Sequence, residues 1–259
     1  MSEPNSWDAL VVGGGVAGLT AATFLARAGL DTLVVNEGES IVRRNAHLEN
    51  VPGFPAGVNS RLFTDLLTEQ AERSGADRRT GRVIALDVLG DEDDPLFWAT
   101  VETEDGEETI PTARVVAASW ADASYLEGTG VERRDAGSKT YVEVDDLGRT
   151  AVPGLYAAGR LTEIYHQAVV AAGDAAETAI TLVHDSGTPF YNDWVAPTGY
   201  FTDRGREVPP ACEEIDADER ERREAESRAV MQEFFAEPHE EPQRTHPSLV
   251  DDDLGRLDE

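Results

Sequence analysis

Three glycines with a fixed spacing form the first candidate site of the sequence. The segment Gly13–Gly18 reads Gly-Gly-Gly-Val-Ala-Gly, follows an apolar run at residues 9–12 and precedes an alanine-rich apolar segment at residues 16–28. In the pattern GxGxxG the first glycine permits a tight turn, the second lets a pyrophosphate approach the backbone, and the third lets a helix pack closely on a strand. The free N–H groups at the start of that helix then hold the pyrophosphate. With a second strand expected at residues 32–35, the segment predicts a Rossmann-type dinucleotide site.

Two polar residues end the second expected strand. An acidic residue near this position commonly accepts hydrogen bonds from the ribose hydroxyls of a bound dinucleotide. Here the position holds Asn36, and Glu37 follows it. Both side chains can bind a hydroxyl group, so we expect both residues at the adenosine ribose.

Few other residues are candidates for redox chemistry, metal binding or proton transfer. The single cysteine, Cys212, excludes a disulfide framework and a CxxC redox pair within this sequence. No metal site is expected, because HExxH and paired Cys/His spacings are lacking. His166 is the candidate catalytic residue, since a histidine can move protons near neutral pH; the alternative is a histidine satisfied by local hydrogen bonds. Arg43 and Arg44 are either a phosphate clamp or surface charge.

The elements that must position these residues follow from apolar periodicity and turn residues. The pattern predicts an α/β fold in which a β-meander accompanies the Rossmann-type unit. Residues 119–140 contain no clear element. The expected elements after residue 60 are a helix at 61–74, the meander at 82–89, 97–102 and 109–116, short strands at 141–144 and 155–158, and a helix at 162–183.

The charge balance of the chain is extreme. It has 51 acidic and 22 basic residues, a formal net charge of −29, and Lys139 as its single lysine. Such a field repels nucleic acid and anionic membranes, so neither is expected as a partner. This composition resembles cytosolic proteins of extreme halophiles, whose mutual repulsion molar salt screens. The sequence contains neither a signal peptide nor an apolar run long enough to span a membrane, so we expect a cytoplasmic protein.

Four segments together resemble the FAD-binding half of thioredoxin reductases, which belong to the flavoproteins with two dinucleotide-binding domains. The segments are Gly13–Gly18, Glu49–Pro55, Thr150–Gly159 and His166–Ala168. Four motifs in the family's order are more specific than one glycine turn. The resemblance therefore implies FAD, rather than NAD, as the cofactor.

The resemblance also implies where FAD would bind. Gln167 and Ala168 would present N–H groups to the pyrimidine edge of the flavin, where a helix N-terminus stabilises negative charge. Arg160 stands where the family has an aspartate, so it would pair with a phosphate or, alternatively, face solvent. The implied cofactor-binding residues are Gly13, Gly15, Val16, Ala17, Gly18, Asn36, Glu37, Arg44, Asn50, Val83, Gly159, Arg160, His166, Gln167 and Ala168.

The sequence departs from the family at residues 119–140. The family inserts its NAD(P)H domain there, together with its redox CxxC pair, whereas this stretch is too short for a second Rossmann domain. We therefore expect one dinucleotide site and no thioredoxin reductase activity. Electrons would come from a separate redox protein such as ferredoxin, from diffusing NAD(P)H, or from the substrate itself.

The organisation expected from these features has two parts. Residues 1–186 form the FAD-binding domain, and residues 187–259 form an acidic extension that is partly helical at 213–236 and disordered at 237–259. The aromatic stretch 190–201 either covers the flavin or packs on the sheet. The function expected first is an FAD-dependent oxidoreductase. The alternatives are a non-catalytic dinucleotide-binding module or a subunit of a larger redox complex, and the resemblance also implies a homodimer.

Overall fold

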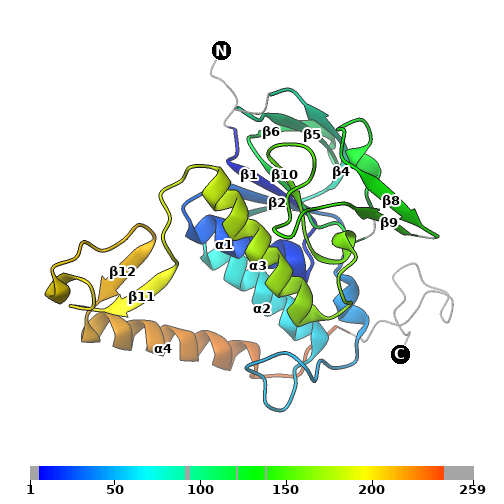
Figure 1. Ribbon diagram of the computed structural model, residues 1–259. Helices are drawn as coiled ribbons and strands as arrows, with labels where there is room; N and C mark the ends of the chain where they lie inside the picture. Colours follow the sequence, from blue (N-terminus) through cyan, green and yellow to red (C-terminus); the bar gives the residue numbers. More distant parts are fainter. Residues whose placement is uncertain (1–5, 91–93, 121, 138, 242–259) are drawn as a thin grey trace.

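A five-stranded parallel sheet lies at the centre of the molecule (Figure 1). The computed structural model describes residues 6–90, 94–120, 122–137 and 139–241. The strand order is β10-β7-β1-β2-β3. The strands are β1 (Ala9–Val12), β2 (Thr32–Asn36), β3 (Asp77–Thr80), β7 (Val115–Ala117) and β10 (Leu155–Ala157). All but β3 are apolar and buried along nearly their whole length, as expected for parallel strands covered on both faces.

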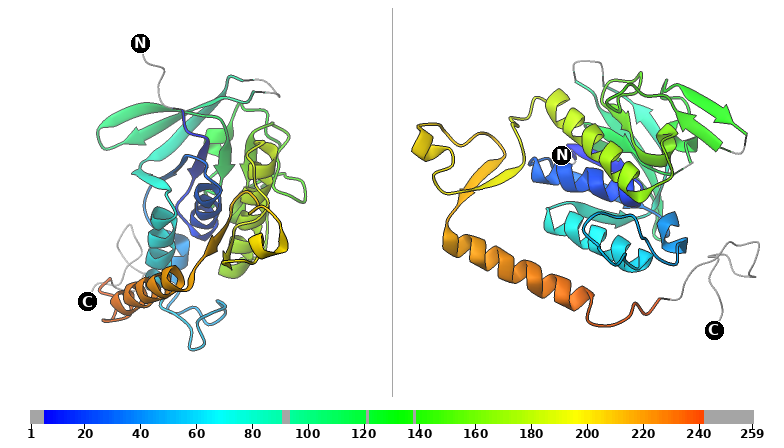
Figure 2. Two further views of the ribbon diagram at one scale, coloured as in Figure 1. Left: turned by 90° about the vertical axis from the view of Figure 1, so that its left-hand side faces the viewer. Right: turned by 60° about the horizontal axis from the view of Figure 1, so that its bottom comes forward.

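Three helices cover one face of this sheet (Figures 1 and 2). They are α1 (Val16–Arg27), α2 (Ser60–Arg73) and α3 (Ala168–Asp185). Alternate sheet residues such as Val11 and Val34 join a core with alanines of α1 and α3. Small side chains let helices and sheet approach closely. Helices α1 and α3 each follow a parallel strand of the sheet, so their N-termini lie at the same edge.

The opposite face of the sheet packs against a β-meander. Its antiparallel strands are β4 (Arg82–Val88), β5 (Phe97–Thr103) and β6 (Gly106–Thr112). The other alternate set of sheet residues, including Leu10 and Leu33, joins a second core with Phe97. The predicted α/β class, with a Rossmann-type unit and a β-meander, is confirmed.

Residues 119–140 are more ordered than expected. They contain the short helix η2 (Ser124–Leu126), and an antiparallel hairpin of β8 (Arg133–Ala136) and β9 (Lys139–Val142) follows. The expected strand at 109–116 is in fact two, since β6 belongs to the meander and β7 to the central sheet.

The helix expected from residue 162 begins later than predicted. The short helix η3 (Gly159–Thr162) ends at Glu163, whose φ of 63° lies in the left-handed region. That conformation interrupts helical hydrogen bonding, and α3 starts only at Ala168, after the N-cap Gln167. The residues just before α3 are therefore free to form a loop.

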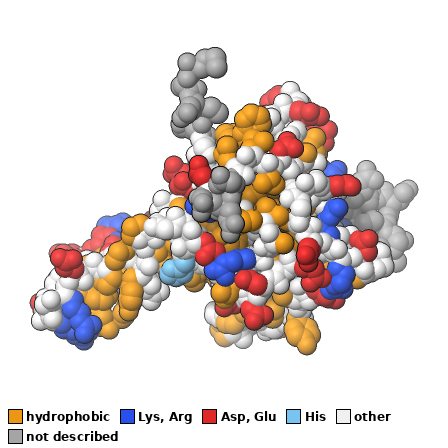
Figure 3. Space-filling view, turned by 45° about the horizontal axis from the view of Figure 1, so that its top comes forward, with side chains coloured by type: hydrophobic (Ala, Val, Ile, Leu, Met, Phe, Trp, Pro, Cys, Tyr) orange, Lys and Arg blue, Asp and Glu red, His pale blue; other side chains and the backbone are white. Residues whose placement is uncertain are grey.

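The C-terminal extension forms an arm beside the helices. A parallel pair, β11 (Trp194–Pro197) and β12 (Cys212–Ile215), projects from the body with η4 (Thr202–Arg204) between its strands. Helix α4 (Ala217–Phe234) then runs past α2 (Figure 2) and contains no buried residue. Apolar side chains show on the surface of the projecting unit in Figure 3. The exposed apolar residues of this part of the chain include Tyr191, Trp194 and Val195.

The chain end contacts the body just before and within the first residues of the segment expected to be disordered. The ring of Phe235 stacks on Phe54 at 6.4 Å, and Nε2 of His239 lies 2.7 Å from Oδ2 of Asp65. Glu241 then forms an ion pair with Arg43 in the short helix η1 (Ile41–Arg44). The remainder of the predicted disordered segment, 242–259, lies outside the described residues. Within the described ranges, we find no helix with the length and apolar character needed to cross a bilayer.

Candidate functional site

A cleft opens at the carboxyl ends of β1 and β2, where dinucleotides bind in open α/β sheets. Its volume is about 340 Å³, and segments far apart in the sequence form its walls. The residues expected at the cofactor that line it are Gly13, Gly15, Val16, Ala17, Asn36, Glu37, Val83, Arg160, His166, Gln167 and Ala168. Gly18, Arg44, Asn50 and Gly159, which the sequence also suggested, do not line it.

The glycine turn leaves room for a phosphate on its cleft side. A Cβ on Gly15 would meet only Ser40 Oγ, at 3.5 Å, whereas a Cβ on Gly18 would lie 1.8 Å from the carbonyl oxygen of Gly13. Gly18 therefore holds α1 against the turn from behind, and Gly15 keeps the backbone open to the cleft. Because no side chain caps α1, its first N–H groups are available to an anion.

The side chain of Asn36 forms hydrogen bonds to the protein backbone. Its Oδ1 accepts a hydrogen bond from the Gly14 amide at 2.8 Å, and its Nδ2 donates to the Gly38 carbonyl at 2.8 Å. A Cβ on Gly14 would lie 2.8 Å from Cγ of Asn36. A larger residue at position 14 would therefore displace the Asn36 side chain. Glu37, at the next position, also lines the cleft, where a carboxylate can accept hydrogen bonds from a ribose.

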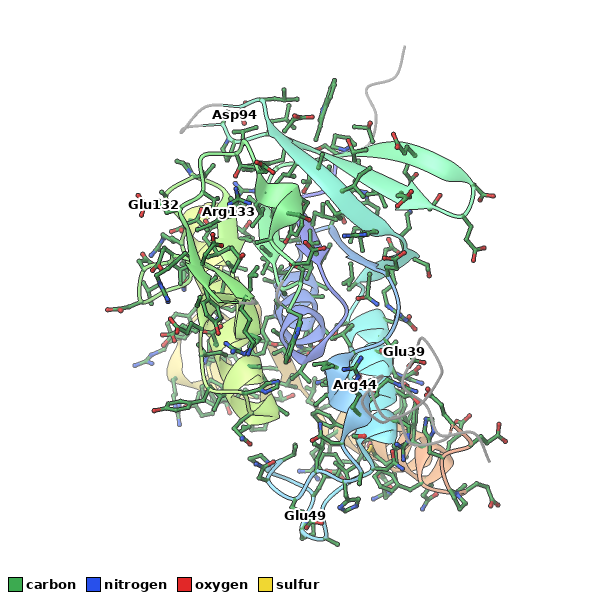
Figure 4. The ribbon with its side chains drawn as sticks, turned by 90° about the vertical axis from the view of Figure 1, so that its right-hand side faces the viewer. Glu39, Arg44, Glu49, Asp94, Glu132 and Arg133 are labelled. Carbon is green, nitrogen blue, oxygen red and sulfur yellow. The ribbon has the colours of Figure 1, made fainter. Side chains whose placement is uncertain are left out.

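The opposite end of the cleft lies at the start of α3. Asn50 donates from Nδ2 to Oε1 of Gln167 at 2.6 Å, which ties the 49–55 loop to the N-cap of α3. Figure 4 shows Glu49 near the tip of that loop. As in α1, no side chain caps α3, so its first N–H groups are also available at the cleft. Two uncapped helix N-termini thus face one cavity.

His166 lies beside a positive charge cluster and an aromatic ring. Its imidazole is 4.6 Å from the ring of Trp120, centroid to centroid. Burial lowers the pKa of His166 most, and the charges of Arg160 and Lys139 lower it further. The imidazole is therefore neutral at pH 7, with one nitrogen to donate and one to accept a hydrogen bond.

Arg160 projects into the cleft without a carboxylate partner among the described residues. Its Nη2 donates to the hydroxyl of Tyr141 at 2.7 Å, its guanidinium lies 5.0 Å from that ring centre, and its buried Nε has no partner. Gly159, just before it, donates its amide to Asp174 at 2.6 Å. A buried guanidinium nitrogen without an acceptor suits an anionic ligand group.

The two consecutive arginines lie outside the cleft lining. Arg43 donates to Thr64, to Asp65 at 2.6 Å and to Glu241, so its charge is balanced by the protein. Arg44 belongs to η1, and its buried Nε has no hydrogen-bond partner in the part of the chain that the structure describes (Figure 4). The predicted contact between Arg44 and the cofactor stays a prediction.

Sequence reasoning missed part of the cleft wall. Trp120 and Tyr125 line the cleft, and the hydroxyl of Tyr125 lies 3.0 Å from Ser119 Oγ. The aromatic residues within 119–126 were the available signal. In contrast, no residue of the aromatic stretch 190–201 lines the cleft, which favours packing on the protein over the alternative of a flavin cover. Phe190 packs on the helix-side core, and Trp194 contacts Phe201.

Two family models match the chain over adjoining segments. An FAD binding domain model matches residues 8–48, which contain the glycine turn. A pyridine nucleotide-disulphide oxidoreductase model matches residues 48–175, through the start of α3. The cofactor is FAD. Its pyrophosphate suits the open glycine turn and the uncapped helix N-terminus described above. The described residues contain no cluster of histidine, cysteine or carboxylate groups able to hold a metal ion.

Curated relatives match along part of their length. Thioredoxin reductase of Aquifex aeolicus is 36% identical over 94 residues, covering 35% of this chain and 29% of that protein. Dihydrolipoyl dehydrogenase of Haloferax volcanii is 30% identical over 200 residues, covering 75% of this chain and 38% of that protein. Thioredoxin reductase of Mycolicibacterium smegmatis is 35% identical over 128 residues, and the match covers 48% of this chain and 38% of that protein. The chain thus spans about a third of the length of these three relatives.

Solved structures share the fold. Thioredoxin reductase from Streptococcus pyogenes superposes with a TM-score of 0.61 at 14% identity, covering 71% of this chain and 99% of that one. An oxidoreductase from Agrobacterium tumefaciens superposes with a TM-score of 0.60, also at 14% identity. The superposition covers 71% of this chain and 100% of that one. The FAD-binding chain therefore has the fold of thioredoxin reductase-like proteins.

Proposed function

We propose that this chain is an FAD-dependent oxidoreductase with a single dinucleotide site and without thioredoxin reductase activity. The observation that carries the proposal is the cleft itself, which joins two uncapped helix N-termini, a neutral histidine and a partly unpartnered arginine. The short stretch between β7 and β9 supports the single site, since its described residues form η2 and one hairpin strand and no further element. Cys212, whose thiol donates to the Asn192 carbonyl, leaves no second thiol for a dithiol relay.

The residues of the chain have separate parts in this proposal. FAD, when bound, supplies the redox chemistry. The backbone at Gly15 and the first turn of α1 bind phosphate, and Glu37 accepts hydrogen bonds from ribose. The N–H groups at Ala168 stabilise negative charge at the flavin edge. His166, held neutral by its surroundings, exchanges a proton with solvent or substrate.

The donor and the assembly state are further parts of the proposal. Electrons come from a ferredoxin-like protein, from diffusing NAD(P)H or from the substrate, because no second nucleotide domain fits in residues 119–140. Residues 1–186 form the FAD-binding domain of a cytoplasmic, halophilic protein, and residues 187–259 form its acidic extension. A homodimer is the expected assembly.

The experiment is a visible spectrum of the protein purified in molar potassium chloride, followed by anaerobic titration with NADH, NADPH and reduced ferredoxin. We expect a bound flavin that one of these donors reduces faster than it reduces free FAD. A colourless protein that takes up no added FAD would refute cofactor binding. A bound flavin that stays oxidised with every donor would instead favour a non-catalytic binding module.

A further inference from the structure

Arg61 is a buried cation with two guanidinium nitrogens that bond to none of the described residues. It lies in the first turn of α2 with 7% of its surface exposed, and its Nε and Nη1 atoms are buried without any hydrogen bond. The buried Nε of Arg44, in the adjoining η1, also has no partner. A buried charge that nothing compensates is strongly unfavourable, and a guanidinium cannot escape the cost by losing its proton.

The other arginines near this place have their charges balanced. Arg43 bonds to Asp65 Oδ1 at 2.6 Å and to Glu241, and it also donates to the carbonyl of Arg61 at 3.3 Å. The second oxygen of Asp65 lies 2.7 Å from His239. These bonds place η1, α2 and the C-terminal end of the arm in one cluster, whose nearby acids serve Arg43 and His239. No ion pair within the described ranges reaches Arg61, although the chain is strongly acidic.

We propose that Arg61, together with Arg44, binds an oxyanion where η1 meets α2. The planar fork of a guanidinium fits phosphate and carboxylate groups, and its N–H donors become satisfied when such a group binds. Neither arginine lines the FAD cleft, so this oxyanion is not the pyrophosphate of the cofactor. Ile41 and Val42, which belong to the same short helix as Arg44, do line the cleft, so the proposed site adjoins one wall of the FAD site.

Two sources can supply the oxyanion. One is a diffusing phosphate or phosphate ester. The other is the acidic end of the chain itself, since residues 242–259 follow Glu241 directly and include Asp251, Asp252 and Asp253. Both sources present the same chemistry to Arg61, and the experiment separates them.

The test uses the full chain saturated with FAD, so that inorganic phosphate cannot enter the cofactor site. Phosphate is titrated at constant ionic strength in potassium chloride, and binding is followed by calorimetry and by thermal unfolding. Arg61→Met should lose at least about tenfold in phosphate affinity, the value of one charged hydrogen bond. If the oxyanion diffuses in, Arg61→Met without phosphate should unfold at the same or a higher temperature than the parent, because an unpaired buried charge is replaced by an apolar chain. If the chain's own carboxylates fill the site, Arg61→Met should unfold at a lower temperature, because it removes their partner.

The matched control is Arg149→Met, which removes an arginine paired with Asp185 at 2.6 Å. It should lower the unfolding temperature and leave the phosphate response intact. An unchanged phosphate response in Arg61→Met would overturn the proposal. If Arg61→Met does not fold, Arg61→Lys tests the same site, since it keeps the charge but loses the fork and should bind phosphate more weakly.

The triple variant Asp251→Asn, Asp252→Asn, Asp253→Asn distinguishes the sources. If these carboxylates occupy the site, the triple variant should bind phosphate about tenfold more tightly than the parent. If the ligand diffuses in, parent and triple variant should bind phosphate equally. If neither protein shows saturable binding, the site does not exist. Because flavin reduction is measured separately, this result is independent of the proposed oxidoreductase activity.

Discussion

The same methyl group, added three residues apart in the glycine turn, should have opposite consequences. In Gly15→Ala the new Cβ would meet only Ser40 Oγ, at 3.5 Å, on the cleft side of the turn. In Gly18→Ala it would lie 1.8 Å from the Gly13 carbonyl oxygen and 3.3 Å from a methyl of Val11. The first change occupies space that the protein leaves open, whereas the second forces α1 away from β1.

The distances set the size of each effect. Gly15 is the N-cap of α1, where alanine in place of glycine costs the apoprotein about 1 kcal/mol or less. The same methyl displaces a phosphate from the backbone N–H groups, and the loss of one charged hydrogen bond weakens FAD binding by roughly 10- to 150-fold. Overpacking at Gly18 should lower the free energy of unfolding by about 1–3 kcal/mol or more.

Two measurements on each variant separate these effects. Denaturant unfolding of the apoprotein in molar potassium chloride gives the free energy of unfolding, and quenching of FAD fluorescence gives the affinity. Gly15→Ala should be nearly as stable as the parent but bind FAD poorly, and Gly18→Ala should be clearly less stable. FAD binding by Gly15→Ala at the parental affinity would refute the assignment of the phosphate position.

Three further predictions concern other parts of the molecule. Lys139→Gln should raise the pKa of His166 by removing a neighbouring positive charge; NMR titration measures it, and Lys139→Arg, the control, should leave it low. Burial acts to raise the pKa of Glu214, but hydrogen bonds from three backbone amides outweigh it and hold the pKa at about 2, against 4.5 in a free chain. Its contribution to the β11–β12 unit is therefore complete above pH 4.5 and lost as the pH falls towards 2. Trp194 fluorescence should report this loss, and the acid transition should be weaker in Glu214→Gln. Asn50→Ala should weaken FAD binding roughly 2- to 10-fold with little change in apoprotein stability, since the lost bond is exposed; an unchanged affinity would contradict a role for this bond at the cofactor.

The sequence was most informative where burial dictated residue type. Strands β1 and β2 are apolar runs between helical and turn signals, and the glycine turn between β1 and α1 has a spacing that few other structures require. In contrast, β3 was not predicted. It is the edge strand of the sheet, and all four of its residues, Asp77–Thr80, are exposed, so no apolar alternation marks it.

The parts of the site that escaped prediction depend on contacts between distant residues. The hydrogen bond of Asn50 to Gln167 spans 117 positions, and no local pattern indicates it. The late start of α3 depends on the left-handed conformation of Glu163, a residue type that carries no such signal. The docking of Glu241 on Arg43 likewise joins residues 198 positions apart within a segment whose composition indicated disorder.

Helix α4 acts as a spacer between β12 and Phe235. Its length and helical phase are therefore the properties that its sequence must preserve. It has 18 residues and no buried side chain, so it is about 27 Å long and gains almost nothing from its own packing. It places Phe235 over Phe54 at the end far from β12, and along its length it pairs Glu226 with Arg73 and Arg223 with Glu213. Most substitutions along its surface should therefore be tolerated. Inserting one residue would turn Phe235 by about 100° around the helix axis, away from its partner ring. The length and phase of this helix, rather than its residues, are what the fold constrains.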